Sequence, residues 1–153
     1  MVPDLEKAIH EINSRMRLLK TLQEDSSNVE DLTERDIMIL GLLSEQGRMN
    51  VSQISSAEPN VSDSTISTNI TKLWRDKKMV SKTVSPENQR TTIVELTDKG
   101  RKAIELVNQQ RAERFKTLLR AIEMTDDEKE VFTRVLTRAI TFLDKHLGKS
   151  NNE

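Results

Sequence analysis

The apolar residues of this chain change their spacing at only one place, and that change limits the folds that the chain can adopt. Up to residue 79, and again from residue 97, apolar residues recur every three or four positions, which is the spacing of an amphipathic helix. Between these regions lie two β-branched runs, VSKTV and TTIVEL, separated by SPENQR, whose Pro, Glu and Asn favour a turn. The sequence therefore predicts a mainly α-helical chain with one β-hairpin.

The first two helices are delimited by residues that cap or break helices. The first, of about 20 residues, starts near Pro3 and ends at residues 24–28, and its apolar face carries Leu5, Ile9, Ile12, Met16 and Leu19. The second opens on a capping box formed by Thr33 and Asp36 and stops at Gly47. Its expected inner positions are Ile37, Leu40 and Leu43.

A helix-turn-helix is predicted directly before the hairpin. A short helix capped by Asn50 is broken at residues 58–60, and a further helix starts after Ser62. The short helix, the tight turn and the following helix form the helix-turn-helix, and the hairpin behind it is a wing.

Two long helices follow the hairpin. Thr97 caps the first, whose candidate inner positions are Ala103, Leu106 or Val107, Phe115, Leu118 and Leu119. Thr125 and Glu128 form a capping box for the second, whose apolar side carries Val131, Val135, Leu136, Ile140 and Leu143. The helices at the two ends of the chain are more apolar on one face than a single small lobe needs. This predicts a homodimer built from residues 1–22 and 126–147.

The helix after Ser62 has an unusual polar face. Its apolar residues fall on one stripe, Ile66, Ile70, Leu73 and Trp74, and Trp74 is interpreted as core at the junction of helix and wing. The other side carries Ser64, Thr65, Ser67, Thr68, Asn69 and Thr71, and each such residue costs roughly 0.5 kcal/mol relative to Ala in a helix interior. Hydroxyl groups suit base edges in a major groove, and Lys72 and Arg75 can reach phosphates. The alternative is a solvated helix that is merely hydroxyl-rich, and the neighbouring turn and wing disfavour it.

Charge is distributed unevenly along the chain. The net charge is −1 and the pI about 6.2, which by itself argues mildly against binding to nucleic acid. Residues 1–36 hold five Lys and Arg against nine Asp and Glu, whereas residues 62–101 hold eight against five. The helix-turn-helix region is therefore locally basic.

Several other classes of protein are disfavoured. The chain has no Cys, which excludes disulfides, thiolate metal sites and a thiol switch. The two histidines, His10 and His146, have no metal-ligand spacing, so no metal and no cofactor are expected. Neither a nucleophilic triad nor a phosphate-binding loop is present, which argues against an enzyme. The chain lacks a long apolar run and has a charged N-terminus, which favours a cytoplasmic protein without a membrane span.

These motifs together resemble a known family. The segments LTERDIMILGLL, VSQISSAEPNVSDSTISTNITKLWRDKKMV and SPENQRTTIVELTDKG are similar to the winged helix-turn-helix of the MarR family of bacterial transcription regulators. The similarity runs from Leu32 to Gly100, and LTDKG is its most family-like part. The resemblance implies a dimer whose first and last helices intertwine, a pseudo-palindromic operator in double-stranded DNA, and a small-molecule effector that releases the DNA.

The wing departs from the family pattern at one position. The family places an Asp two residues before an Arg that enters the minor groove, whereas this chain has Asn88 before Arg90, with Gln89 between them. The Arg is present and its carboxylate partner is replaced by an amide. This substitution bears on the affinity of the wing for DNA more than on its position.

The sequence thus predicts a dimeric winged-helix transcription regulator, with a repressor favoured over an activator. Residues 32–100 are the expected DNA-binding lobe, and 1–31 and 101–153 the expected dimerisation helices. The alternative is a winged-helix module for protein–protein association in which DNA binding is weak or lost. The candidate DNA-binding residues are Ser62, Ser64, Thr65, Ser67, Thr68, Lys72, Arg75, Lys82, Asn88 and Arg90.

Overall fold

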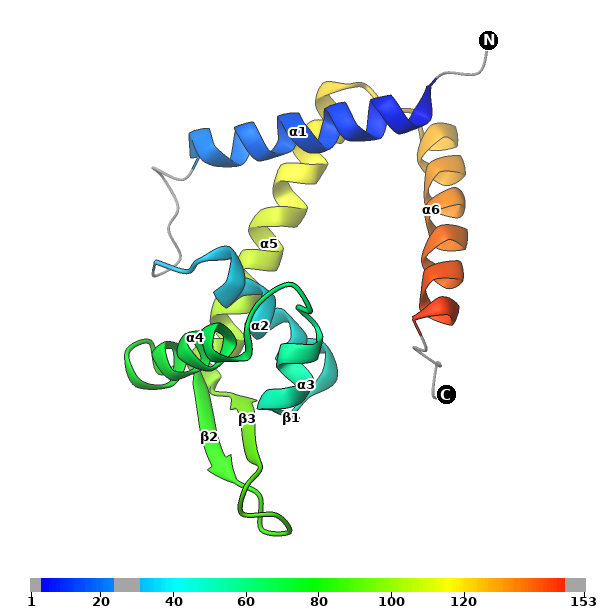
Figure 1. Cartoon of the computed structure of the whole chain (residues 1–153). Helices are drawn as coiled ribbons and strands as arrows, with labels where there is room; N and C mark the ends of the chain where they lie inside the picture. Colours follow the sequence, from blue (N-terminus) through cyan, green and yellow to red (C-terminus); the bar gives the residue numbers. More distant parts are fainter. Residues whose placement is uncertain (1–3, 24–30, 148–153) are drawn as a thin grey trace. The chain divides into compact units, whose positions relative to one another are not determined.

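The computed structural model describes residues 4–23 and 31–147 of the chain (Figure 1). Two compact units, residues 1–108 and 109–153, are described separately below. The elements in chain order are α1 (Leu5–Gln23), α2 (Glu34–Gln46), β1 (Met49–Asn50), α3 (Val51–Ser56), α4 (Asp63–Arg75), β2 (Val80–Val84), β3 (Thr92–Leu96), α5 (Asp98–Ala121) and α6 (Asp126–His146). The predicted mainly α-helical fold with a small β wing is confirmed.

The predicted helix caps are present as hydrogen-bonded motifs. The Thr33 hydroxyl accepts from the backbone N–H of Asp36 at 3.1 Å, and the Asp36 carboxylate accepts from the Thr33 N–H at 3.0 Å. Asn50 caps α3 in the same reciprocal way, and Thr125 caps α6. Gly47 ends α2 with a φ of 76°, a left-handed conformation that favours glycine. The predicted boundaries at Pro3 and at residues 24–28 lie outside the described residues.

The hairpin belongs to a sheet of three antiparallel strands in the order β1-β3-β2. Lys82 and Met49 both pair with Val94, from β2 and β1 respectively. The sequence did not predict β1, because a strand of two residues is too short for alternating polarity to reveal it. The sheet therefore joins the start of the helix-turn-helix to the wing.

The core lies in the first unit, between α2, α3, α4, the sheet and the start of α5. Its buried apolar residues are Ile39, Leu40, Leu43, Ile54, Ile66, Ile70, Leu73, Met79, Val80, Val94, Ala103, Ile104 and Val107. The predicted inner position Ile37 is half-buried and packs against this core, while Asp36 and Ile39 are the fully buried neighbours on α2. Of the two candidates Leu106 and Val107, Val107 is the buried one. Phe115 was expected to face inward, but it is exposed.

One charged side chain is buried beside this core. Asp36 is only 2% exposed, and its Oδ2 atom lies 2.7 Å from the Lys77 ammonium. Lys77 also donates to the backbone carbonyl of Asp31 at 2.9 Å, and the Asn69 amide lies 3.4 Å from the second oxygen of Asp36. Burial raises the pKa of Asp36, but hydrogen bonds from Lys77 and Thr33 outweigh it, so that the pKa is lowered. The pair links the start of α2 to α4 and to the turn after α4.

The start of α5 is held against the same turn from the other side. The Thr97 hydroxyl accepts from the Gly100 N–H at 3.1 Å, as expected of a cap, and donates to the Lys78 carbonyl at 2.8 Å. The Thr97 N–H donates to the Met79 carbonyl at 3.0 Å. A Cβ atom at Gly100 would overlap that carbonyl, so no larger residue fits there without a shift of the backbone. This explains the Thr and the Gly of the LTDKG segment.

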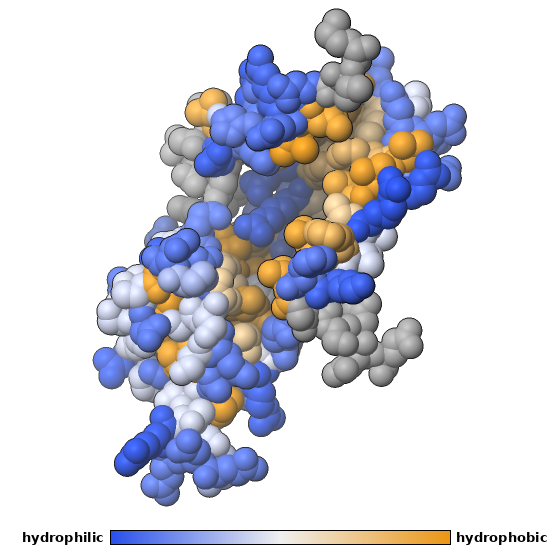
Figure 2. All heavy atoms as spheres, turned by 45° about the vertical axis from the view of Figure 1, so that its right-hand side comes forward, coloured by the Kyte–Doolittle hydropathy of each residue, from blue (hydrophilic) through white to orange (hydrophobic). Residues whose placement is uncertain are grey.

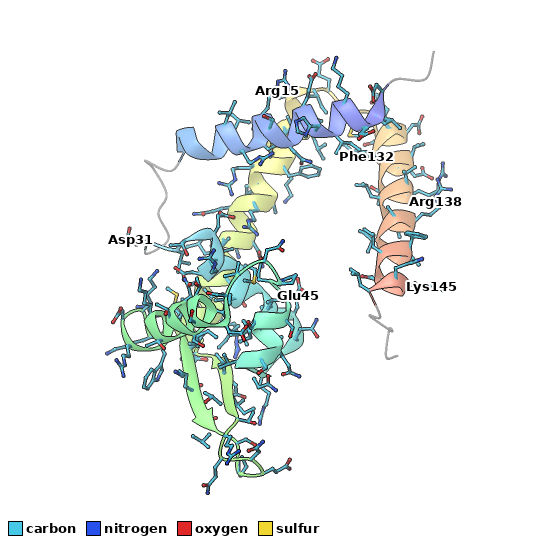
Figure 3. All side chains as sticks on the ribbon, in the orientation of Figure 1. Arg15, Asp31, Glu45, Phe132, Arg138 and Lys145 are labelled. Atoms are coloured by element: carbon cyan, nitrogen blue, oxygen red, sulfur yellow. The ribbon has the colours of Figure 1, made fainter. Side chains whose placement is uncertain are left out.

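The helices at the two ends of the chain have largely exposed apolar faces. In α1, Leu5, Ile9, Ile12 and Leu19 are exposed, and Met16 is half-buried. In the second unit, α6 has no buried residue among those described. Figure 2 shows exposed apolar residues (orange) among hydrophilic ones (blue). In Figure 3 the labelled side chains of α6, Phe132, Arg138 and Lys145, project from the helix. None of the described helices combines the length and apolar character needed to span a membrane.

The close approach at Gly100 can be tested against a matched glycine. We expect Gly100→Ala to lower the free energy of unfolding by about 3 kcal/mol, because the added methyl must displace the Met79 backbone. Gly41, inside α2, has no heavy atom within 4 Å of an added Cβ. Gly41→Ala should therefore stabilise the chain by about 0.5–1 kcal/mol through helix propensity. Urea unfolding of both variants measures the difference, and equal stabilities would contradict the packing described.

The buried pair predicts a pH-dependent effect of Lys77→Met. The pKa of Asp36 is below its ordinary 3.8 in the folded chain, so its carboxylate stabilises the fold above that pH and this stabilisation is lost below it. Removing Lys77 leaves a buried charge unpaired and should cost about 3 kcal/mol at neutral pH. The gap in unfolding free energy from the wild type should narrow as the pH falls below 3.8.

The double variant Asp36→Asn/Lys77→Met is the control for this experiment. An amide at position 36 can still accept from the Thr33 N–H and carries no charge to leave unpaired. It should therefore be more stable than Lys77→Met alone at neutral pH. A gap that stays constant with pH would show that the pair contributes nothing through charge.

Candidate nucleic-acid interface

Helix α4 has one buried face and one exposed, hydroxyl-rich face. The buried stripe consists of Ile66, Ile70 and Leu73, each at most 1% exposed. The exposed side carries Ser64, Ser67, Thr68, Lys72 and Arg75. Thr65 is half-buried, and so is Thr71, which was expected to point away from the core. Most of the predicted contact residues of this helix are therefore accessible to a ligand.

The hydroxyls at the start of α4 are connected to one another. Ser62 caps the helix, and its Oγ atom lies 2.7 Å from the Thr65 hydroxyl and 3.2 Å from that of Ser64. One turn on, the Thr68 hydroxyl donates to the Ser64 carbonyl at 2.8 Å. These local bonds fix rotamers while leaving lone pairs of the hydroxyl oxygens exposed. The first two turns thus present acceptor oxygens in defined positions.

Helix α3 sets the start of α4 through one polar contact across the turn. The buried Ser55 hydroxyl donates to the Asp63 carboxylate, which is in the first turn of α4. Within the turn, the Val61 N–H donates to the Glu58 carbonyl at 3.0 Å. The helix-turn-helix is therefore fixed by hydrogen bonds as well as by the apolar core.

The wing tip is shaped by Asn88. Its side-chain oxygen accepts from the backbone N–H of Arg90 at 3.1 Å, and its carbonyl accepts from the Thr91 N–H at 2.9 Å. Asn88 therefore orders the backbone that carries Arg90, and no hydrogen bond from Asn88 to the guanidinium is observed in the described part of the chain. The Arg90 side chain is exposed at the tip.

The prediction that Trp74 lies in the core is wrong. The residue is 38% exposed, because position 74 lies at the edge of the buried stripe of α4. Its ring contacts two cations: the Arg75 guanidinium carbon lies 5.3 Å from the ring centroid, and the Lys82 ammonium 5.0 Å. Lys82, in the middle of β2, is half-buried. No local pattern predicts this cluster, because Trp74 and Lys82 belong to different elements, α4 and β2, on either side of a turn.

Helix α4 and the wing carry four cations that are at least partly accessible. Lys72, Arg75, Lys82 and Arg90 form no ion pair with any residue that the structure describes. Lys77, which contributes to the local excess of positive charge, instead forms an ion pair with Asp36. No group of three or more His, Cys, Asp or Glu residues in the described ranges could hold a metal ion. Helix α4 and the wing thus present a polar surface with four cations.

The chain is similar to a family of transcriptional regulators and to several solved structures. A family model described as "Transcriptional regulator SarA/Rot" matches residues 17–107. No curated protein sequence matches the chain.

Among solved structures, FabT of Streptococcus pneumoniae in complex with DNA has a TM-score of 0.71 at 20% identity, covering 92% of this chain and 96% of that one. Wild-type apo MarR of E. coli has a TM-score of 0.71 at 19% identity, and the match covers 91% of this chain and 98% of MarR. PcaV of Streptomyces coelicolor, in complex with its natural ligand, has a TM-score of 0.59 at 19% identity, and the match covers 92% of this chain and 97% of PcaV. At these identities the likeness shows the fold, which is the one that the MarR resemblance implied.

Proposed function

Because the chain belongs to the SarA/Rot family of transcriptional regulators, we propose that it binds an operator in double-stranded DNA as a homodimer and represses transcription there. The observation that carries this proposal is the exposed face of α4, where ordered hydroxyls and unpaired cations lie beside a wing that carries Lys82 and Arg90. Regulation rather than catalysis is the proposed role, and the bacterial cytoplasm is its proposed location. The DNA-bound structure of the similarly folded FabT supports the choice of ligand.

The proposed contacts divide by chemistry. Short hydroxyl side chains suit base edges, whereas Lys and Arg suit phosphates. The residues proposed to face bases are Ser62, Ser64, Thr65, Ser67 and Thr68, and those proposed to face phosphates are Lys72, Arg75 and Lys82. At the wing tip, Arg90 is proposed to enter the minor groove, where the potential is most negative over narrow A·T segments. Asn88 supports it through the backbone bond at 3.1 Å.

A homodimer is proposed because α1 and α6 each leave an apolar face uncovered in the single chain. Burying such a face is favourable by about 25 cal/mol per Å² of apolar area. In this proposal residues 32–100 form the DNA-binding lobe, and residues 1–31 and 101–153 form the dimerisation helices. Two recognition helices would then enter major grooves about one turn, 34–36 Å, apart.

A small-molecule effector is the proposed signal for release of DNA. The chain has no cysteine, so a small molecule is favoured over reversible thiol oxidation. The similarly folded PcaV was solved with its natural ligand, which supports this kind of control. The alternative function is a module for protein–protein association with weak DNA binding. The net charge of −1 and the amide at Asn88 favour that alternative.

The first test compares the wing with the start of α4. We expect Arg90→Ala to weaken operator binding about equally across sequences that share a core site and to flatten the salt dependence by about one unit, because one phosphate-like contact is lost. Ser64→Ala or Thr68→Ala should instead relax base preference at single positions. Fluorescence anisotropy at two salt concentrations, with sets of substituted duplexes, measures both effects.

The association alternative gives a different result in the same assay. If Arg90→Ala changes neither affinity nor salt slope on a footprinted operator, the wing does not engage DNA. Absence of duplex binding by the wild-type chain at low salt would contradict the proposed function as a whole.

The second test concerns assembly through α6. We expect the double variant Leu136→Glu/Leu143→Glu to be monomeric and to bind operator weakly, because both changes place charge on the apolar face. The matched control is Thr137→Glu/Thr141→Glu, which adds the same charge to the opposite, polar face of the same helix and should stay dimeric. Sedimentation equilibrium distinguishes the states. A wild-type mass of 17.5 kDa at concentrations that saturate the operator would contradict the dimer.

A further inference from the structure

Trp74 is a large aromatic residue placed where the folding core does not require it. Its side chain is 38% exposed, whereas its neighbour Leu73 is fully buried. It is also the only tryptophan of the chain. An exposed indole at the end of α4 is therefore better explained by what it contacts than by packing.

Two cations from different elements lie on this ring. Arg75 belongs to α4 and Lys82 to β2, and both charges lie within about 6 Å of the ring centroid, the range of cation–π attraction. Two like charges brought together repel, and the negative faces of an indole offset part of that repulsion. Neither cation is paired with a described carboxylate. The ring thus contacts two cations that no described carboxylate neutralises.

We propose that Trp74 is a positioning residue for phosphate binding, whose ring holds Arg75 and Lys82 together as a two-cation clamp on the DNA backbone. This inference rests on the proposed function. Long cationic side chains lose rotamer freedom when they bind a phosphate, and a ring that restricts them beforehand lowers that cost. Charge complementarity identifies the ligand of this clamp. No described carboxylate neutralises the two cations, and the phosphates of the DNA backbone carry the negative charge that would do so.

The spacing along α4 fits this assignment. Ser64 and Trp74 are ten residues apart, which is about 15 Å along a helix. The major groove is about 12 Å wide, so a helix with its first turn on the base edges brings its last turn to the phosphates at the rim. The same helix would therefore read bases at one end and grip the backbone at the other.

Binding to a mixed-sequence duplex at several salt concentrations tests the clamp, because phosphate contacts do not depend on sequence. Trp74→Leu should weaken binding about fivefold for the loss of cation–π contacts, with Trp74→Phe between it and the wild type. The salt slope of the Leu variant should be shallower by about one unit, since one phosphate is no longer neutralised. The loss should be the same on operator and mixed-sequence DNA.

A double-mutant cycle separates positioning from a merely structural role. In a Lys82→Met background, Trp74→Leu should cost clearly less than in the wild type, because one cation of the clamp is already absent. Arg48→Met is the matched control for loss of a cation, since Glu95 already pairs Arg48 at 3.1 Å. It should leave both the affinity and the cost of Trp74→Leu unchanged. Additive effects of Trp74→Leu and Lys82→Met would overturn the proposal.

Tryptophan fluorescence gives a direct readout, because all emission arises from Trp74. Iodide should quench the free protein efficiently, since two cations attract it to the ring, and saturating duplex should protect against quenching. Unchanged quenching at saturating DNA would place Trp74 outside the interface and overturn the clamp. If Trp74→Leu unfolds at a lower urea concentration than the wild type, its weaker DNA binding could reflect lost stability. In that case the DNA affinity of Trp74→Phe and the iodide quenching of the wild type decide whether the clamp exists. Absence of duplex binding by the wild type contradicts the proposed function, whereas binding that Trp74→Leu leaves unchanged contradicts only the clamp.

Discussion

The ion pair between Asp36 and Lys77 joins three parts of the chain that the apolar core alone would leave free to slide. Hydrophobic contacts are not directional, so they hold α2 and α4 together without fixing their angle. A buried carboxylate with partners in α2, α4 and the following turn has one satisfactory arrangement. The orientation of α4, and with it the direction of its hydroxyl face, depends on this pair.

The turn between α4 and β2 receives a second constraint from α5. Thr97 and Gly100 bring the start of α5 onto the backbone of Lys78 and Met79, while Lys77 in the same turn is held by Asp36. Consecutive residues of this turn are thus bonded to the start of α2 and to the start of α5. The helix proposed to enter the groove and the strand that leads to the wing are consequently both held to the same lobe, although their charged surfaces come from separate parts of the sequence.

Local chemistry explains which features could be predicted from the sequence. Caps at Thr33, Asn50 and Ser62 depend on residues three positions apart, so the sequence shows them directly. The strand β1 and the burial of Asp36 depend on partners more than 40 residues away, and no local pattern encodes them. Trp74 was misplaced for a related reason: helical periodicity puts it at the edge of the stripe, and only the fold brings Lys82 to its ring.

Lys82 lies in β2, which is an edge strand of the sheet. Within the described residues β2 pairs only with β3, so its other edge presents unpaired backbone groups to solvent. Such an edge is a template for strand addition from another molecule, and a charged residue in the middle of the strand opposes it. Lys82 occupies the central position of β2. The same lysine therefore opposes edge-to-edge pairing of the wing with another chain.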